Sequence, residues 1–215
     1  MKNFPGQTEI LLLGVTGGIA SGKSTVACML EEMGAPMIDF DVLAREVVAP
    51  GKPAWKEIVD YFGNGVLQKD RSLDRVQLRD EVFQNPEKRK ILESMTHPRI
   101  LDLYLTRVKE FRSASTPILQ AVIPLLFEAN LQKLVHKILV VYIPWEMQRE
   151  RLMKRDHISR AEAERILSAQ MPLDEKMARA DFVIHNEKGL EKTRKQVENI
   201  MHSLKTKLAV RIKNG

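Results

Sequence analysis

The sequence predicts an α/β fold in which a parallel sheet is covered by helices on both faces. Five short apolar runs, rich in β-branched residues, lie at residues 10–15, 37–38, 118–123, 138–143 and 182–184. Helical patterns lie between most of them. Nearly continuous apolar strands are typical of a sheet buried on both faces, and strands that alternate with helices pair in parallel. A glycine-rich turn follows the first run directly and favours the same fold.

Length and composition indicate a globular protein of one domain, with room for inserted sub-domains. The 215 residues are 44% hydrophobic and 29% charged. The apolar runs fall far short of the ~20 residues that span a bilayer. The N-terminus meets Pro5, Gly6 and Glu9 before its first apolar run and has no cleavage-like site. We therefore expect a soluble, cytoplasmic protein.

Cysteine and histidine usage gives no sign of a thiolate or zinc site. Cys28 is the only cysteine, which excludes an intramolecular disulfide, and the five histidines lack the paired spacing of zinc ligands. Cys28 falls on the helix expected after the glycine-rich turn. There we expect it to be a packed, inert thiol.

The net charge of +6 resides in the C-terminal tail. The whole chain has 34 Lys and Arg and 28 Asp and Glu. Residues 188–215 contain 8 of these basic residues and 2 of the acidic ones, so residues 1–187 contain 26 basic and 26 acidic residues. The tail also places six apolar residues at helical spacing: Leu190, Val197, Ile200, Met201, Leu204 and Leu208. We expect a terminal helix that packs by this face and exposes a solvated basic face. Contact with nucleic acid is the alternative, but no recognised nucleic-acid motif supports it.

A phosphate-binding pattern, G-x-x-x-x-G-K-[ST], is met by GGIASGKS at residues 17–24, between a strand and a helix. Backbone N–H groups of such a loop and of the helix N-terminus form a concave surface for anionic oxygens. Lys23 can neutralise the β and γ phosphates, and Ser24 can ligate Mg²⁺. The helix should run from about Lys23 to Met33, where Gly34 is a suitable stop. A glycine turn that only caps a helix is the alternative.

Two acids, Asp39 and Asp41, stand where the second strand ends. If the chain stays extended, alternation puts both on one side, and if strand two neighbours strand one, they lie beside the phosphates. Such a carboxylate could take the proton of an acceptor hydroxyl or hold Mg²⁺ through water. An N-cap plus a solvated loop acid is an equal alternative. Many phosphate-binding-loop proteins have an acid at the end of the third strand that supports the metal, but the third strand expected here ends without one, although Glu128 follows soon after. This absence favours Asp39 and Asp41 for supporting the metal and for the role of base.

Two helical stretches interrupt the strand pattern. The first lies between residues 50 and 116 and suits a sub-domain for substrate specificity. It contains helical patterns at residues 55–62, 73–83, 86–95 and 100–111, the third with Asn85 as its N-cap. The second stretch, residues 145–170, breaks near residues 156–158 and restarts at Ser159 with a capping box. In it Arg151 and Arg155 share a helix face, which suits a mobile cover over phosphates; a solvated face is an equal alternative.

In their order and spacing these pieces resemble the dephospho-coenzyme A kinase family over about residues 10–186. The matching segments are TGGIASGKST, IDFDVLAREVV, THPRI, VIPLLFE, RLMKRD, ILSAQ with EK shortly after, and ADFVIHN. Taken singly, only the first segment is specific, whereas the ordered set is very specific.

The resemblance implies a P-loop NTPase-like, three-layer α/β fold with a five-stranded parallel sheet, a helical substrate-binding insertion and a helical lid. The nucleotide-binding core would comprise residues 1–49, 113–144 and 171–215, the substrate domain residues 50–112, and the lid residues 145–170. The implied reaction uses ATP and Mg²⁺ to phosphorylate the ribose 3′-hydroxyl of dephospho-coenzyme A, which gives coenzyme A and ADP.

The resemblance also implies roles for individual residues. Asp41 would be the general base, and Lys23, Arg151 and Arg155 would stabilise the transferred charge. The nucleotide would be bound by Gly17, Gly18, Ile19, Ala20, Ser21, Gly22, Lys23, Ser24, Thr25 and Asn186, the last bordering the adenine. The substrate would be bound by Asp39, Asp41, Arg45, His97, Pro98 and Leu125. Mg²⁺ would be supported by Ser24 and Asp39.

Two positions depart from the family's pattern. Ala20 stands where the family often has a third glycine, which suggests that this loop position keeps a negative φ. Phe40 stands where the family often has alanine, but both flanking acids remain.

Two other functions share parts of this pattern. A kinase of another nucleoside, nucleotide or small metabolite would have the loop and the lid arginines but not THPRI and VIPLLFE. A non-enzymatic nucleotide-binding module could use the basic tail to contact RNA, but it would not need the acids and lid arginines. We expect dephospho-coenzyme A as the partner of a monomer or weak homo-oligomer, without nucleic acid or membrane.

Overall fold

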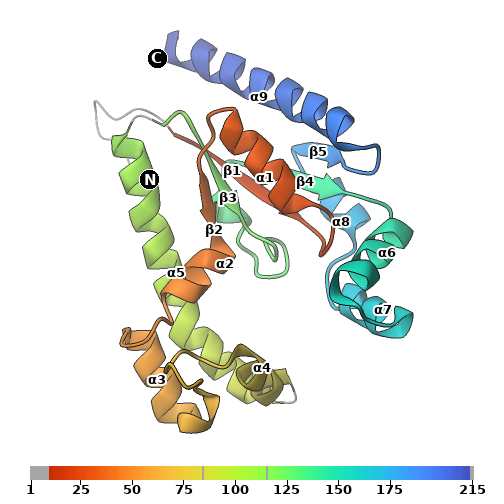
Figure 1. Cartoon of the computed structure of the whole chain (residues 1–215). Coiled ribbons are helices and arrows are strands. Elements are labelled where there is room, and N and C mark those ends of the chain that lie inside the picture. The colour runs from red at the N-terminus through yellow and green to blue at the C-terminus, as the bar shows by residue number, and fades with distance from the viewer. Residues whose placement is uncertain (1–9, 84, 115, 214–215) are drawn as a thin grey trace. The chain divides into compact units, whose positions relative to one another are not determined.

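A computed structural model describes residues 10–83, 85–114 and 116–213 of the chain (Figure 1). It contains two compact units. The first comprises the described residues of Met1–Ile38 and Phe111–Gly215, and the second comprises Asp39–Glu110. The predictions made for residues 1–9, 214 and 215 lie outside the described residues. Within the described chain, no helix is both long and apolar enough to cross a membrane.

The predicted parallel sheet of five strands is confirmed. Its strands are β1 (Leu11–Gly17), β2 (Met37–Asp39), β3 (Ile118–Val122), β4 (Lys137–Tyr142) and β5 (Phe182–His185). β1 pairs in parallel with β3 on one side and with β4 on the other, and β4 pairs with β5. Every residue of β3 is buried, which explains why its sequence is apolar without alternation.

The strand order is β2-β3-β1-β4-β5, so β3 separates β2 from β1. The condition attached to the aspartate pair, that strand two neighbours strand one, is therefore not met. The order places β1 in the middle of the sheet, and the glycine-rich loop follows its carboxyl end. Ligands of parallel α/β sheets bind outside this edge, near the point where the strand order reverses.

Helices α1 (Lys23–Glu32) and α9 (Leu190–Lys213) cover one face of the sheet (Figure 1). Val26 and Leu30 of α1 share one buried cluster with Val197 and Met201 of α9 and with residues of β1, β3, β4 and β5. The terminal helix therefore packs by its apolar face, as predicted, except at Leu190, which is exposed.

The first helix ends close to its predicted limit. Gly34 follows it at φ 91°, and its N–H donates to the Glu31 carbonyl at 2.9 Å; glycine adopts this left-handed conformation at no steric cost. The expectation of a packed Cys28 was wrong, because this thiol is exposed. Its position on α1 points away from the side that carries Val26 and Leu30.

The arginine-rich stretch forms two helices, α6 (Trp145–Asp156) and α7 (Arg160–Ser168). They pack on each other through a small buried cluster of Leu152, Ala163 and Leu167. Ile19 and Ala20 of the glycine-rich loop join this cluster. The loop therefore packs directly against the segment predicted to be a lid.

The break between these helices also lies where it was predicted. His157, at φ 55°, follows α6, and Ser159 accepts the N–H of Glu162 at 3.2 Å at the start of α7. A further helix, α8 (Leu173–Ala178), comes soon after and was not predicted. It has only 6 residues, too few to show a helical period.

Helices dominate the second unit, as was predicted for residues 50–116; α2 lies before that stretch. They are α2 (Phe40–Glu46), α3 (Pro53–Phe62), α4 (Arg75–Phe83) and most of α5 (Pro86–Ser113), with a 3-10 turn, η1 (Asn64–Val66), after α3. Trp55, Ile58 and Leu73 belong to its buried core. Asn85 is the N-cap of α5, as expected, because its Oδ1 accepts the N–H of Lys88 at 3.0 Å.

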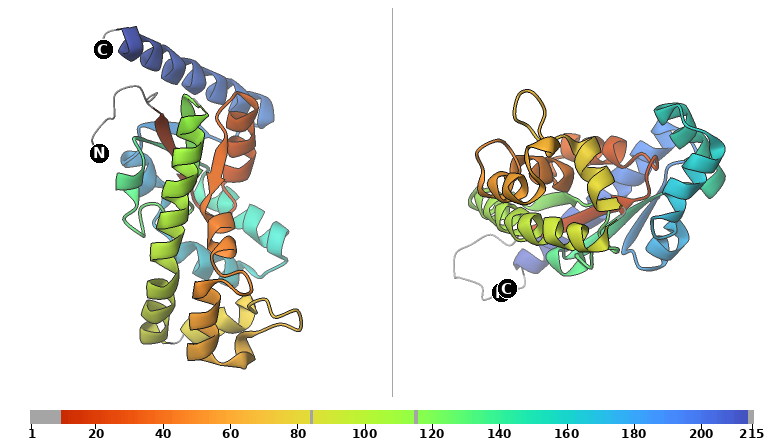
Figure 2. Two further views of the ribbon diagram at one scale, coloured as in Figure 1. Left: turned by 90° about the vertical axis from the view of Figure 1, so that its left-hand side faces the viewer. Right: turned by 90° about the horizontal axis from the view of Figure 1, so that it is seen from below.

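One prediction for this unit was wrong: residues 86–95 and 100–111 form a single helix, α5, rather than two (Figure 2). Pro98 lies inside it, where proline cannot donate a backbone hydrogen bond and usually kinks or breaks a helix. The helix continues because residues beyond the proline are buried in the fold.

The Asp181 side chain, just before β5, forms hydrogen bonds with the amino end of β4. Its carboxylate accepts from Lys137 Nζ at 2.6 Å and from the N–H of Ile138 at 2.9 Å. Burial alone would raise its pKa, but these hydrogen bonds and the charges of Lys137 and Lys207 outweigh burial and lower the pKa below its ordinary value of 3.8. Such a group stabilises the fold above its unfolded-state pKa, and the contribution is lost as the pH falls through the folded-state pKa.

Replacing Asp181 with Asn should therefore destabilise the protein in a pH-dependent way. We expect the variant to lose on the order of 1 kcal/mol of unfolding free energy at neutral pH, because the ion pair is partly exposed. The loss should begin to shrink below pH 3.8, the ordinary pKa of an aspartate, and should shrink further as the pH falls through the lower pKa of the folded state. Urea unfolding of both proteins at neutral pH and at about pH 3 measures this difference. An equal loss at both pH values would contradict an electrostatic origin.

Candidate active site

The glycine-rich loop joins the end of β1 to the start of α1. Gly22 is the N-cap of α1 at φ 89° and ψ 25°, a left-handed conformation that favours glycine. Glycine has no side chain to cap a helix, so the first N–H groups of α1 are left for an anion, which the helix dipole also attracts. The Lys23 ammonium donates to the carbonyls of Gly17 at 3.0 Å and Gly18 at 2.8 Å. The loop can therefore bind phosphate through its backbone, with the lysine beside it.

Ala20 corrects the expectation that this position keeps a negative φ. Its φ is 59°, in the left-handed region that costs a non-glycine residue roughly 1–2 kcal/mol. The expectation was wrong because the turn of the loop imposes this conformation on whichever residue occupies it. The Ala20 methyl offsets part of the cost, since it packs against the cluster of Leu152 and Leu167.

Two glycines of the loop are required by side chains that approach closely. A Cβ atom on Gly18 would lie 2.1 Å from Gln148 Nε2, and one on Gly22 would lie 2.2 Å from Asn186 Nδ2. Both distances are far below van der Waals contact, so a larger residue would displace an amide that binds the loop. These glycines therefore serve the fit between the loop and later parts of the chain.

Two glutamines hold the backbone of Ile19 from both sides. Gln148 of α6 donates from Nε2 to the Ile19 carbonyl at 2.8 Å, and Gln170 accepts the Ile19 N–H on Oε1 at 2.9 Å. Gln148 is only 4% exposed. Ile19 was predicted to bind nucleotide, but its own backbone polar groups bond to these side chains. Sequence reasoning missed both glutamines; the available signal was that Gln148 precedes Leu152 by four residues on one helix face.

Asn186 holds the other part of the loop. Its Nδ2 donates to the Ser21 carbonyl at 2.9 Å, and its Oδ1 accepts from Thr193 Oγ1 at 2.8 Å, both in a buried setting. Its carbonyl accepts from Arg151 Nη2 at 3.0 Å. Asn186 was expected to border the adenine, and the structure places it on the loop backbone. Arg151, predicted from the lid, lies beside the loop as well.

The second predicted lid arginine has a different partner. Arg155 forms two hydrogen bonds with its neighbour Asp156, from Nε to Oδ1 at 2.7 Å and from Nη2 to Oδ2 at 2.9 Å. These bonds raise the pKa of Arg155 and lower that of Asp156. Of the two predicted arginines, the structure therefore brings Arg151 to the loop and pairs Arg155 with an acid on its own helix.

Asp39 and Asp41 lie at the start of α2. Asp39 is its N-cap, because Asp39 Oδ1 accepts the N–H of Asp41 at 2.8 Å. The chain therefore does not stay extended here. Asp39 is an N-cap, which was one of the two arrangements predicted for this pair of acids. Asp41 is exposed in the first turn. Burial lowers the pKa of Arg75, the charge of Arg45 lowers it further, and Asp41 opposes this shift, so these charged groups lie within electrostatic reach of one another.

A cavity of about 400 Å³ lies within the second unit. Its wall is mostly apolar and includes Ile58, Leu73, Leu78 and Leu92, and three arginines, Arg75, Arg79 and Arg89, also line it. His97, a predicted substrate residue, is part of the same wall. Of the other predicted substrate residues, Pro98 is exposed on α5, and Leu125 is exposed in the first unit.

Ser24 and Asp39 were predicted to support Mg²⁺. Ser24 is exposed in the first turn of α1, and Asp39 Oδ1 already accepts a backbone hydrogen bond. Among the residues that the structure describes, no group of three or more His, Cys, Asp or Glu could hold a metal ion. A hydroxyl and at most one carboxylate fit a Mg²⁺ that is bound mainly by nucleotide phosphates and water.

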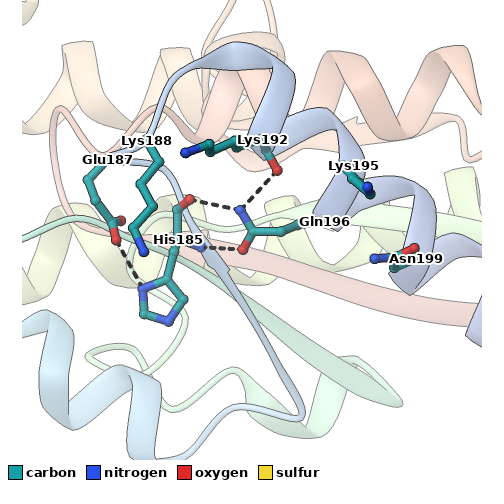
Figure 3. A pocket seen from close by; sticks show the side chains of 7 residues that line it. All are labelled: His185, Glu187, Lys188, Lys192, Lys195, Gln196 and Asn199. Carbon is teal, nitrogen blue, oxygen red and sulfur yellow. Dashed lines mark hydrogen bonds and ion pairs between the residues drawn. The ribbon is translucent and has the colours of Figure 1, made fainter.

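A second cavity, of about 480 Å³, is lined by residues of β5, of α9 and of the turn between them (Figure 3). None of its lining residues belongs to the loop of residues 17–25. Gln196 accepts the N–H of His185 and donates to its carbonyl, both at 2.9 Å. These are the bonds that another strand would make to the edge strand β5. We therefore interpret this face as a covered sheet edge rather than a substrate site.

Replacing Gln148 with Leu tests whether the loop depends on its outside support. The change keeps the side-chain size but removes the donor to Ile19, a bond worth about 1 kcal/mol. We expect the affinity for a non-hydrolysable ATP analogue, measured by calorimetric titration, to fall on the order of tenfold.

Gln196→Leu is the matched control, because it also removes bonds from a glutamine to the backbone, but at the sheet edge. It should lower the unfolding free energy and leave the nucleotide affinity unchanged. Wild-type affinity in Gln148→Leu would contradict the role of Gln148.

Comparison with known proteins identifies the family. The family model described as dephospho-CoA kinase matches residues 11–192. The dephospho-CoA kinase of Carboxydothermus hydrogenoformans is 45% identical over 196 residues, or 91% of this chain and 95% of that protein. A solved dephospho-CoA kinase from Campylobacter jejuni is 29% identical, with a TM-score of 0.70 over 91% of this chain and 98% of that one. Shikimate kinase from Acinetobacter baumannii, solved in complex with shikimate, shares the fold alone, at 17% identity and a TM-score of 0.52 over 92% of this chain and 94% of that one. The chain belongs to the dephospho-CoA kinase family.

Proposed function

We propose that this protein transfers the γ-phosphate of ATP to the ribose 3′-hydroxyl of dephospho-coenzyme A and releases coenzyme A and ADP. Membership of the family supports this reaction. The observation that carries it to this chain is a phosphate-binding loop whose backbone is held by Gln148, Gln170 and Asn186. Enzymes of phosphoryl transfer mainly position their reactants and stabilise charge, and a loop held from outside serves that task.

The loop and the first turn of α1 would bind the β and γ phosphates. Lys23, now bonded to loop carbonyls, would turn to the phosphate oxygens when they arrive. Arg151 would add a second positive charge from beside the loop, and Arg155 would do so after leaving Asp156. Ser24 would hold the Mg²⁺ that accompanies ATP, with Asp39 in support through water, and that ion would neutralise phosphate charge when bound.

Asp41 is the proposed general base. Its carboxylate is exposed in the first turn of α2, one turn before Arg45, so an acceptor hydroxyl can reach it. The carboxylate would orient the 3′-hydroxyl and accept its proton while the ribose oxygen bonds to the γ-phosphorus. The bond from that phosphorus to the bridging oxygen of ADP breaks in the same step.

The proposed substrate domain, residues 50–112, lies almost entirely in the second unit and would provide the acceptor side of the site. Dephospho-coenzyme A carries a diphosphate joined to a long, largely uncharged pantetheine arm. A matching site needs cations beside an apolar wall. The cavity of about 400 Å³ offers both, and Arg75 in its wall lies within electrostatic reach of Asp41.

We further propose a cytoplasmic enzyme that works as a monomer or weak homo-oligomer without nucleic acid. Part of the positive charge of the tail is used in contacts that pack α9 on the first unit, rather than in contacts with nucleic acid. Lys205 Nζ donates to the Met33 carbonyl at 2.9 Å, and Arg194 pairs with Glu32 at 2.9 Å. Both contacts join the basic helix to α1 or to the residue that ends it.

A panel of acceptors tests the proposed function. We expect dephospho-coenzyme A to stimulate ADP release far more than AMP, CMP or uridine, because only this acceptor carries the arm that the cavity would bind. A coupled assay of ADP release measures each rate. Phosphorylation of AMP alone would contradict the proposal and favour a nucleotide kinase.

Replacing Asp41 with Asn tests the proposed base. We expect turnover of dephospho-coenzyme A to fall by about 10²-fold or more, because general base catalysis is lost, while the affinity for an ATP analogue stays intact. Asp60→Asn removes an exposed acid from α3 of the same unit and should leave turnover unchanged. A normal rate in Asp41→Asn would exclude Asp41 as the base.

A further inference from the structure

Lys176 of α8 carries a charge into the interior of the first unit. Its side chain is 0% exposed, whereas lysine is almost never fully buried unless it is paired. We propose that Lys176 and its partner Glu128 are positioning residues that hold the phosphate-binding loop through Gln170. The inference rests on the proposed binding of nucleotide by that loop.

The contacts of Lys176 form a compact buried group. Its Nζ lies 2.7 Å from Glu128 Oε1 and donates to the Pro124 carbonyl at 3.4 Å. The Glu128 side chain is 22% exposed, so the pair is largely withdrawn from water. Desolvation of two charges is costly, and an apolar pair of similar size is often as stable or more stable. Stability alone is therefore a weak reason for an ion pair at this place.

Glu128 also holds the segment that carries Gln170. The oxygen that meets Lys176, Glu128 Oε1, accepts the N–H of Met171 at 3.1 Å. Gln170 is the preceding residue, and its Oε1 accepts the Ile19 N–H at 2.9 Å. A shift of Glu128 would therefore move Met171 and with it the acceptor of the loop.

The same group reaches the strand that leads into the loop. The Pro124 carbonyl, which accepts from Lys176, also accepts from Thr16 Oγ1 at 3.2 Å. Thr16 is fully buried in β1, directly before Gly17. Pro124 thus fixes the ion pair to the strand that precedes the loop, while the contact with the loop itself runs through Gln170 to Ile19.

A second carboxylate makes the same kinds of contact without a connection to the loop. Asp181 accepts from Lys137 Nζ and from the N–H of Ile138, at the amino ends of β4 and β5. β1 runs parallel to β4, and the loop follows the carboxyl end of β1. Asp181 therefore lies at the other end of the strands, away from the loop. The Lys137 and Asp181 pair is therefore a control with the same types of contact, at a more exposed place.

The test replaces each pair by apolar residues, so that no uncompensated charge remains in the interior. K176M/E128L removes the proposed positioning pair, and K137M/D181L removes the control pair. The readout is the affinity of each folded variant for a non-hydrolysable ATP analogue, measured by calorimetry. We expect K176M/E128L to weaken this affinity about tenfold and K137M/D181L to leave it unchanged.

A double-mutant cycle with Gln170→Leu tests the route. If the pair acts through Gln170, adding K176M/E128L to Gln170→Leu should cause no further loss, because the Ile19 N–H has already lost its acceptor. Losses that multiply, or wild-type affinity in K176M/E128L, would overturn the proposal. The readout needs no acceptor, so a failure of dephospho-coenzyme A as substrate is distinguished from a failure of this inference.

The variant K176Q/E128Q provides a second test that can be used if K176M/E128L does not fold. The new amide oxygen at position 128 can still accept the N–H of Met171. We therefore expect affinity within about twofold of the wild type. A tenfold loss in this variant would show that the charges themselves govern nucleotide binding, and it would overturn the proposal.

Discussion

The peptide groups on either side of Ile19 are held by two side chains, and the rest of the site depends on this constraint. Gln148 donates to the Ile19 carbonyl at 2.8 Å, and Gln170 accepts the Ile19 N–H at 2.9 Å. A glycine-rich loop has many conformations, because glycine lacks the Cβ that restricts the backbone, and ordering such a loop costs entropy. Side chains that order it beforehand leave more of the binding free energy for the nucleotide.

The topology of the sheet brings these supports to the loop. β1 lies at the centre of the order β2-β3-β1-β4-β5, and the carboxyl ends of parallel strands meet at one edge. Gln148 follows β4 and Asn186 follows β5, so both return to the edge where the loop begins. The loop can then keep left-handed residues such as Ala20, at φ 59°, because contacts from other segments hold the turn. The second unit has its own core and a cavity lined by apolar residues and arginines, where the proposed function places acceptor recognition.

Strong local patterns were sufficient to predict the five strands, most of the helices and the cap at Asn85, because apolar runs bounded by glycine or proline leave few other structures. Features that depend on distant residues could not be predicted in this way. Gln148 contacts Ile19 across 129 residues of sequence, and its spacing of four from Leu152 places it on a buried helix face without indicating its partner. The helical patterns at residues 86–95 and 100–111 were predicted as two segments, but they form one continuous helix, α5, whose part beyond Pro98 includes the buried residues Tyr104 and Val108. The φ of Ala20 follows the turn of the loop rather than the preference of alanine.

Amide hydrogen exchange at Ile19 in the nucleotide-free protein tests most directly whether the loop is held before nucleotide binds. Because Gln170 accepts this N–H, exchange should be slow without nucleotide, and an ATP analogue should change it little. The protection should fall in Gln170→Leu. The amide of Ile138, which donates to Asp181 at the amino ends of the strands, should keep its wild-type exchange rate in this variant. Exchange of the Ile19 amide at the rate of an unstructured peptide in the nucleotide-free wild type would contradict this claim.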